Sequence, residues 1–301
     1  MSTSANPSAP MPIPPTPPPK TFTPPHDGEV IVATDRQYFL GPQLGSGAFG
    51  AVFECRDEWG NELVAKVLLP RNRTYEDVRE EWMHELRNLE RLRHPNITYI
   101  YDAFEYRDTF YLVIERCSMT LADLFSPDID GDVWLPYVAR DILHALDFIH
   151  SYGYVHKDLH PGNIFISEMR DRMVPGNESI WQFKIGDLGI SRLEGEIRLF
   201  STILAQWMLP PEFLAPDDFG VLGRHVDIYH TGLLLLSLLL HEEPEFTEQQ
   251  IVEGLPRQIA ESLPSPFSAA IARALRRHVA DRTQSAMEMW REISFAAQAP
   301  K

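Results

Sequence analysis

One polar segment near the middle of the chain, His156-Lys-Asp-Leu-His-Pro-Gly-Asn163, constrains the fold more than any other feature. The apolar residues Ile164-Phe-Ile166 follow it at once and are typical of a buried strand. Asp158 and Asn163 can therefore place a base and a metal ligand on one loop. Asp187, twenty-four residues after Asn163, offers a second carboxylate. Because Mg²⁺ takes hard oxygen ligands together with substrate phosphates, the pattern predicts a metal-assisted phosphate site.

A glycine-rich segment closer to the N-terminus predicts a phosphate-binding turn. Gly45, Gly47 and Gly50 are spaced so that two strands and their turn can lie directly over phosphate oxygens. A dinucleotide-binding fingerprint has similar glycines but requires a helix directly after the turn. Here Ala51-Val-Phe-Glu-Cys55 continues as a strand, which favours the strand–turn–strand interpretation.

A lysine inside an apolar strand points to the same chemistry. Lys66 lies in the run Leu63-Val-Ala-Lys-Val-Leu-Leu69, where a charged side chain is costly unless its ammonium group has partners. Phosphate oxygens and a carboxylate on the following helix would supply them. We expect that carboxylate to be Glu85, with Glu81, on the adjacent helical turn, as the alternative.

The remaining pattern predicts a small strand-rich half followed by a larger helical half, with the change near residues 116–119. A helix is expected to open at Thr74, because Asp77 three residues later completes a capping box, and Pro95 stops it. The other expected elements are strands around 97–104 and 110–115, a helix over about 135–152, and a buried helix at 233–240.

In this order and at these spacings, the motifs from Gly45 to Arg282 resemble those of the eukaryotic-type protein kinase catalytic domain of the Ser/Thr class. The resemblance implies an α+β fold of two lobes. The N-terminal lobe would hold a five-stranded antiparallel sheet and one helix, and the C-terminal lobe would be mainly helical. The expected boundaries are a Pro-rich tail at 1–29, lobes at 30–116 and 117–297, and a short tail at 298–301.

The resemblance also implies catalytic and metal-binding roles. Asp158 would accept the proton of the substrate hydroxyl, with His160 beside the transferred phosphate. Asn163 and Asp187 would hold Mg²⁺, with Mn²⁺ as the alternative ion. In the second lobe, two implied contacts join Glu212 to Arg282 and Asp227 to the catalytic loop.

ATP is the implied cofactor. Lys66 would bind its α- and β-phosphates and pair with Glu85, and the adenine would lie between Val52 and Ala65 on one side and Phe165 on the other. The full set of residues implied for ATP binding is Leu44, Gly45, Gly47, Gly50, Val52, Ala65, Lys66, Ile114 at the gatekeeper position, Glu115, Cys117 and Phe165.

Four features depart from the family pattern. Lys157 replaces an arginine that can grip an activation-loop phosphate with two hydrogen bonds, so activity without that phosphorylation is expected. His160 replaces a lysine and brings less positive charge to the transition state, which predicts slow turnover. Ala205 stands where a threonine is usual, and residues 167–182 are longer than the usual hairpin.

Three activities are compatible with these motifs. The first is Mg-ATP-dependent phosphorylation of serine or threonine in a protein substrate. The second is a pseudokinase that acts as a scaffold, which His160 and Ala205 favour. The third is a small-molecule kinase, because aminoglycoside and choline phosphotransferases have a similar catalytic loop. Those enzymes generally lack the loop from Gly45 to Val52 and the sequence Pro210-Pro-Glu212.

Composition narrows the partners and the compartment. The chain has 27 Lys and Arg against 43 Asp and Glu, a net charge of −16 that repels nucleic acid. No signal peptide or membrane-spanning segment is visible and the two cysteines form no disulfide framework, so we expect a cytoplasmic or nuclear protein without a membrane partner. The first 29 residues are expected to be a solvated tail, with binding of an SH3- or WW-type domain at 15–20 as the alternative.

Overall fold

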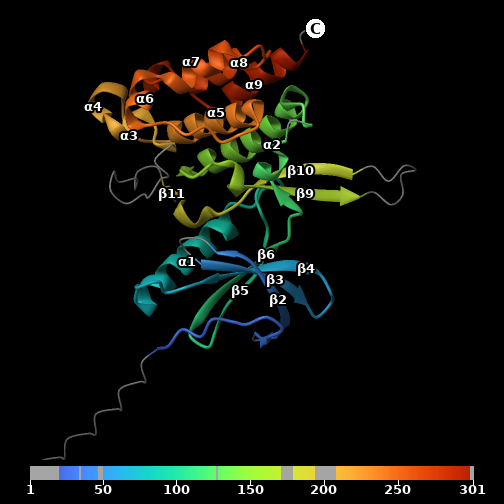
Figure 1. The fold of residues 1–301 in the computed structure, drawn as a ribbon. Helices are drawn as coiled ribbons and strands as arrows, with labels where there is room; N and C mark the ends of the chain where they lie inside the picture. The colour runs from blue at the N-terminus through green and yellow to red at the C-terminus, as the bar shows by residue number, and fades with distance from the viewer. Residues whose placement is uncertain are drawn as a thin grey trace, which may run out of the picture.

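The structure is a computed structural model that describes residues 20–33, 35–46, 50–126, 128–170, 179–193 and 208–298. Figure 1 shows a sheet-rich N-terminal part and a mainly helical C-terminal part stacked on one another. The α+β fold of two lobes predicted from the sequence is therefore confirmed. The two parts are called the N-lobe and the C-lobe below.

The N-lobe sheet is antiparallel, and within the described residues it has six strands, one more than the sequence predicts. They are β1 (Val30–Val32), β2 (Gln37–Ser46), β3 (Gly50–Asp57), β4 (Glu62–Leu68), β5 (Ile100–Tyr106) and β6 (Thr109–Glu115). Their order across the sheet is β1-β2-β3-β4-β6-β5. The additional strand, β1, has three residues and pairs with β2 at the sheet edge, which is too short for a clear sequence signal.

The two faces of this sheet belong to different environments, because side chains alternate along a strand. On β4, Val64 and Lys66 face the cavity between the lobes. Ala65 and Val67 point the other way, into a small outer core that also contains Tyr38, Phe53 and Tyr111. Because of this alternation, only every second side chain of β4 can contact a ligand in the cavity between the lobes.

The N-lobe helix α1 (Tyr75–Arg91) begins and ends where the sequence predicts. The Asp77 N–H donates to Thr74 Oγ1 at 3.1 Å and the Thr74 N–H donates to Asp77 Oδ2 at 3.0 Å, which completes the expected capping box. The helix ends before Pro95, and its buried side chains include Glu85, Asn88 and Leu89. The buried face of α1 therefore places the carboxylate of Glu85 beside the sheet.

Residues 20–29, which the sequence assigns to a solvated tail, instead lie against the N-lobe. Pro25 is buried, and the half-buried Phe22 packs against the hydrophobic core. The Thr23 N–H donates to Thr109 Oγ1 at 2.9 Å. The expectation of a solvated tail is therefore wrong for residues 20–29, because tertiary contacts outweigh a proline-rich composition there. The rest of the predicted tail lies outside the described residues.

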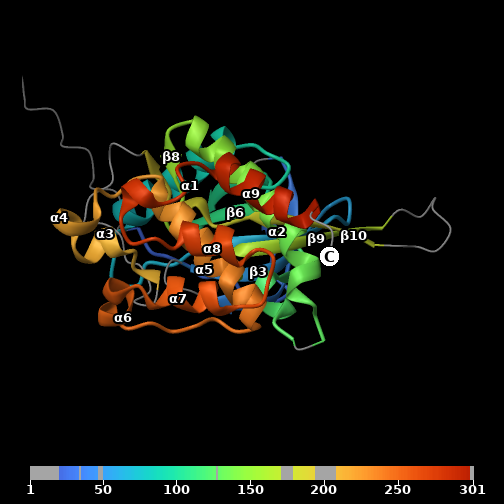
Figure 2. The same cartoon turned by 90° about the horizontal axis from the view of Figure 1, so that it is seen from above.

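The C-lobe is built around helix α5 (His225–Leu240), which contains the apolar run predicted to be a buried helix. Leu233 to Leu236 and Leu238 are buried, so that prediction is confirmed. Figure 2 shows α5 in the middle of the helical part, where it contacts α2 (Gly131–Ser151) and α8 (Ser268–Ala274). The other helices are α3 (Pro211–Leu214), α4 (Pro216–Phe219), α6 (Glu248–Glu253), α7 (Leu255–Ser262) and α9 (Ala286–Gln298).

Short strands and 3₁₀ turns complete the side of the C-lobe that faces the N-lobe. Strands β7 (Met119–Thr120), β9 (Ile164–Arg170) and β10 (Ser179–Ile185) form a small sheet, and β8 (Tyr154–Val155) pairs with β11 (Arg192–Leu193). The 3₁₀ turns η1 (Leu121–Leu124), η2 (Pro161–Asn163) and η3 (Leu188–Ile190) belong to this region, whereas η6 (Val279–Asp281) comes between α8 and α9 along the chain. Among the helices described, none is both long and apolar enough to cross a bilayer.

The β9–β10 hairpin accounts for part of the long segment noted at 167–182. Its strands stay paired from Ile164 and Ile185 out to Arg170 and Ser179, and Figure 1 shows the hairpin projecting sideways from the C-lobe. Trp181 stacks on Trp134 of α2 with ring centres 4.7 Å apart, which anchors the hairpin base to the lobe. Residues 171–178 at its tip lie outside the described residues.

Candidate active site

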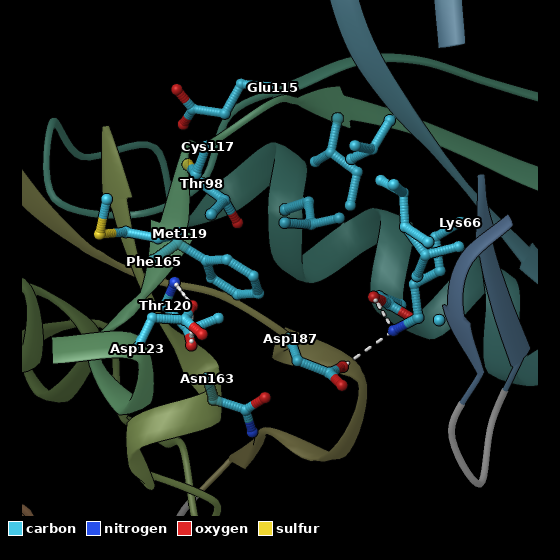
Figure 3. A pocket seen from close by; sticks show the side chains of 17 residues that line it. Lys66, Thr98, Glu115, Cys117, Met119, Thr120, Asp123, Asn163, Phe165 and Asp187 are labelled. Atoms are coloured by element: carbon cyan, nitrogen blue, oxygen red, sulfur yellow. Dashed lines mark hydrogen bonds and ion pairs between the residues drawn. The ribbon is translucent and has the colours of Figure 1, made fainter. Parts of the chain in front are cut away.

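A cavity of about 430 Å³ lies between the two lobes, and Figure 3 shows the side chains that line it. Its walls combine an apolar region with a cluster of charged and amide groups. Lining residues that the sequence singles out are Leu44, Gly45, Val52, Lys66, Glu85, Ile114, Glu115, Cys117, Asn163, Phe165 and Asp187. Gly47 lies outside the described residues.

Two residues predicted for ATP binding do not line this cavity. Ala65 is 1% exposed and packs in the outer core, and Val64 takes its place because it shares a strand face with Lys66. Gly50 lies against β4, where an added Cβ would come within 2.2 Å of the Val67 carbonyl oxygen. Close strand pairing is therefore sufficient to require glycine at Gly50.

The charged end of the cavity is organised around the ammonium group of Lys66. Its Nζ lies 2.7 Å from Glu85 Oε1 and 2.9 Å from Asp187 Oδ1, and Figure 3 draws both contacts as dashed lines. Glu81, the alternative partner, pairs instead with Arg73. The helical turn therefore selects Glu85, as expected.

Burial and charge act against each other in this cluster. Burial alone would lower the pKa of Lys66, but the charges of Asp187 and Glu85 outweigh it and raise that pKa. Burial would raise the pKa of Asp187, yet Lys66 holds it below its usual value. The pKa of Glu85 is raised, because burial and the nearby Asp187 outweigh its share of the one ammonium group. The cluster is thus short of positive charge.

Asp227 of α5 anchors the polar loop from His156 to Asn163 through hydrogen bonds to its backbone. This fully buried carboxylate accepts the backbone N–H groups of His156 at 2.9 Å and Lys157 at 2.8 Å, and it contacts His150 Nε2 at 2.8 Å. Burial would raise the pKa of Asp227, but these donors and the nearby histidines lower it overall. Lys157 is held at φ +73°, a left-handed conformation that costs free energy for a non-glycine residue. The contact implied for Asp227 is present.

Asp158 and Asn163 lie together on this loop. The Asn163 side-chain Nδ2 donates to Asp158 Oδ2 at 3.0 Å and to the Asp158 carbonyl oxygen at 2.9 Å. Because the amide nitrogen is used in this way, the carbonyl oxygen of Asn163 remains as the group that can bind a cation. Figure 3 shows Asn163 beside Asp187 on the C-lobe side of the cavity.

His160 has a defined tautomer in its neutral form. Its Nδ1 accepts the backbone N–H of Gly162 at 3.2 Å, so the ring proton must be on Nε2. Nε2 lies 4.0 Å from Asp158 Oδ2. An added Cβ on Gly162 would come within 3.0 Å of the His160 ring. His160 therefore presents a single N–H donor on the side of the loop where Asp158 lies.

The second contact implied for the C-lobe is also present. Arg282 Nη1 and Nη2 donate to the two carboxylate oxygens of Glu212 at 2.7 and 2.8 Å, and both side chains are fully buried. Arg282 also lies over the ring of Tyr229 and donates to the His225 carbonyl oxygen. This pair fixes the segment that begins at Met208 to α5. Ala205 lies outside the described residues.

Sequence reasoning missed several residues that line the cavity. Asp123 accepts the Thr120 N–H at 2.7 Å in a capping box, a pattern that the sequence Thr120-Leu-Ala-Asp123 could have revealed. Gly186 does not line the cavity but packs against Phe165, which does, and it was missed because this contact joins distant segments. An added Cβ there would lie 2.4 Å from the Phe165 ring, so the large ring on the cavity floor requires glycine behind it. The other lining residues missed are Val64, Leu89, Thr98, Met119 and Thr120.

The sequence was compared with known protein families and with characterised proteins. The sequence matches the protein kinase domain over residues 38–296. It is similar to cyclin-dependent kinase-like 1 of Caenorhabditis elegans, at 27% identity over 66% of this chain and 54% of that protein. It is also similar to calcium/calmodulin-dependent protein kinase type 1 of Macrobrachium nipponense, at 27% identity over 74% of this chain and 64% of that protein.

A plant relative, calcium-dependent protein kinase 24 of Arabidopsis thaliana, is 30% identical over 74% of this chain and 37% of that protein. The chain thus spans about half the length of the first relative and a smaller share of the plant protein. The domain match extends over most of the sequence and includes both lobes together with the cavity between them. The chain belongs to the protein kinase domain family.

Proposed function

We propose that this chain transfers the γ-phosphate of ATP to serine or threonine hydroxyls in protein substrates. The observation that carries the proposal is the contact of the Lys66 ammonium group with both Glu85 and Asp187 inside the interlobe cavity. Two carboxylates around one cation leave the cluster short of positive charge. A divalent cation bound beside Asp187 would supply that positive charge, and the phosphate oxygens of ATP could complete its coordination.

The apolar region of the cavity suits the adenine ring. Val52, Ile114 and Phe165 line it, and aliphatic and aromatic side chains on both sides of a flat base provide favourable packing. Lys66 is suited to the α- and β-phosphates, since its charge lies where the apolar region ends. The backbone of Glu115 and Cys117 would hydrogen-bond the adenine edge. Leu44 and Gly45 would cover the nucleotide.

Asn163 and Asp187 would hold the divalent cation. Both present oxygen ligands to the same cavity, and such hard donors fit Mg²⁺ best, with Mn²⁺ as a substitute. The bound cation would offset the negative charge that develops on the phosphate oxygens. The low pKa of Asp187 keeps its carboxylate ionised at neutral pH, as a ligand must be.

Asp158 would act as the base in the transfer step. The substrate hydroxyl oxygen forms a bond to the γ-phosphorus while the bond from that phosphorus to the β–γ bridging oxygen breaks, and ADP leaves with the electron pair. The hydroxyl proton passes to the Asp158 carboxylate. The bond from Asn163 Nδ2 to this carboxylate fixes its orientation.

His160 would assist through its Nε2–H group. A neutral imidazole donates one hydrogen bond to the transferred phosphate, whereas a lysine in this place would add a full charge. The tautomer imposed by the Gly162 N–H directs that donor toward the reacting side of the loop. The cost of losing the charge is slower phosphate transfer, and a scaffold without catalysis is the alternative that this residue favours.

A panel of acceptors tests the acceptor class directly. The full chain is incubated with radiolabelled ATP and Mg²⁺ in the presence of a Ser/Thr peptide library, a generic basic protein, and a set of amino-alcohols and aminoglycosides. We expect label in peptide and protein hydroxyls. Label confined to the small molecules would show a small-molecule kinase. Tight Mg-ATP binding with no transfer to any acceptor would show a scaffold protein.

A further inference from the structure

Residues 20–29 form an extended segment, here called the N-terminal strap, that crosses the β5–β6 turn and reaches the first turn of α1. Lys20 Nζ lies 2.7 Å from Asp108 Oδ1 and 5.0 Å from the centre of the Tyr75 ring. The Thr21 N–H donates to Asp108 Oδ2 at 3.0 Å. At the other end, Glu29 pairs with Arg107 at 2.9 Å. In Figure 1 this dark-blue segment runs along the N-lobe at the end far from the C-lobe.

The strap contributes one ring to an aromatic cluster that joins three elements. Phe22 lies 5.9 Å from Tyr75, the first residue of α1, and 6.5 Å from Phe110 of β6. Phe110 lies 5.1 Å from Tyr75 and stacks at 5.2 Å on Trp82 of α1. The Trp82 indole N–H also donates to the Tyr111 carbonyl oxygen at 2.9 Å. The strap, α1 and β6 therefore share one packed contact.

Helix α1 depends on such contacts for its position. Of its four fully buried side chains, Glu85 and Asn88 are polar and contribute little apolar burial. The partly buried Tyr75, Trp82 and Leu86 add apolar contacts with the core, and Tyr75 and Trp82 belong to the aromatic cluster. Glu85 follows Trp82 by three residues, which places the two about one helical turn apart. A shift of α1 at the aromatic cluster would therefore also move the Glu85 carboxylate, which contacts Lys66.

We propose that Phe22 is a positioning residue, through which the N-terminal strap holds α1 where Glu85 reaches Lys66. The inference rests on the proposed function, because it assigns a regulating contact to the same phosphate-binding pair. In this proposal, a segment of the same chain that precedes the kinase domain stabilises the position of α1. Detachment of the strap would lower activity without any change at the catalytic loop.

The strap offers a matched control at the next residue. Thr23 is exposed, and its hydroxyl makes a single long contact of 3.5 Å to the Thr21 carbonyl oxygen. Its two contacts with Thr109 use the backbone N–H and carbonyl oxygen of Thr23, which survive substitution by alanine. Phe22→Ala removes the ring from the aromatic cluster, whereas Thr23→Ala keeps every contact of the strap with α1.

The test compares Phe22→Ala, Phe22→Leu and Thr23→Ala in the full chain, each alone and Phe22→Ala also combined with Glu85→Gln. We expect kcat toward a basic protein to fall roughly ten-fold in Phe22→Ala, less in Phe22→Leu, and less than about two-fold in Thr23→Ala. If Phe22 acts through Glu85, Phe22→Ala adds no further loss in the Glu85→Gln background. Losses that multiply in the double variant would overturn the proposal.

Hydrogen exchange of α1 gives a second readout that needs no residual activity. Amides of residues 78–91 should exchange faster in Phe22→Ala and Phe22→Leu than in Thr23→Ala. Equal exchange in all three variants would overturn the inference, and Phe22→Leu keeps the test open should Phe22→Ala fail to fold. Full activity in Glu85→Gln would instead refute the role given to the Lys66–Glu85 pair, which separates failure of the proposed function from failure of the strap.

Discussion

Substitution of Gly186 by alanine probes how tightly the floor of the cavity is packed. An added Cβ would lie 2.4 and 2.6 Å from two carbons of the Phe165 ring and 3.2 Å from the Thr98 methyl group. The φ of Gly186 is not positive, so alanine meets no backbone penalty and the cost is purely the clash. Overpacking of this kind costs about 1–3 kcal/mol. For a domain of this size, that corresponds to a fall in Tm of about 2–12 °C.

A second substitution, at Phe165, should relieve this clash, and the pair of substitutions therefore tests the prediction. Phe165→Leu removes the ring that the new methyl group meets, so Gly186→Ala should cost much less in a Phe165→Leu background. We expect a coupling free energy of about 0.5–3 kcal/mol from the cycle, measured by thermal or urea unfolding of the four proteins. Gly186→Ala should also weaken ATP binding. Strictly additive losses would show that the two residues are not in contact, and the account of the cavity floor would be wrong.

Three further predictions concern the C-lobe. Arg282→Ala leaves the buried Glu212 carboxylate unpaired, which costs about 3–5 kcal/mol and lowers Tm by about 6–20 °C, whereas Arg257→Ala at an exposed pair should cost less than about 1 kcal/mol in the same unfolding assay. The pKa of Asp227 is lowered on folding, so its stabilising contribution is present above the unfolded value of about 3.9 and is lost as the pH falls below it. Unfolding titrations should therefore show a weaker loss of stability below that pH in Asp227→Asn. His160→Lys should raise kcat several-fold in a steady-state phosphorylation assay, because it adds positive charge beside the transferred phosphate; an unchanged or lower kcat would contradict the role given to His160.

Much of this architecture could be predicted from local sequence patterns. The capping box at Thr74 and Asp77 predicted where α1 begins, because both partners lie within four residues. The spacing along that helix favoured Glu85 over Glu81 as the partner of Lys66, and the contacts agree. The apolar run at 233–240 predicted a buried helix, since no amphipathic alternation was present. In each case, the information lies within one element.

The features that were missed depend on contacts between elements. Ala65 is an exception: it was expected in the cavity, but side-chain alternation within β4 alone places Val64, not Ala65, on the face of Lys66. Gly186 shows no local signal, because its reason is the Phe165 ring from another strand. The strap was expected to be a solvated tail, because its proline-rich composition gives no sign of the aromatic contacts that Phe22 makes with Tyr75 and Phe110.

Phosphate transfer by Asp158→Asn is the measurement that tests the central claim most directly. Single-turnover transfer of labelled γ-phosphate to a basic protein is compared with the parent chain, and Mg-ATP affinity is measured for both by equilibrium titration. We expect transfer to fall by at least about 10²-fold, the range associated with removal of a general base, while Mg-ATP affinity changes little. Equal transfer by the parent and Asp158→Asn would contradict the assignment of Asp158 as the base. Loss of Mg-ATP binding in Asp158→Asn would contradict the separation between the residues that hold the nucleotide and the residue that accepts the proton.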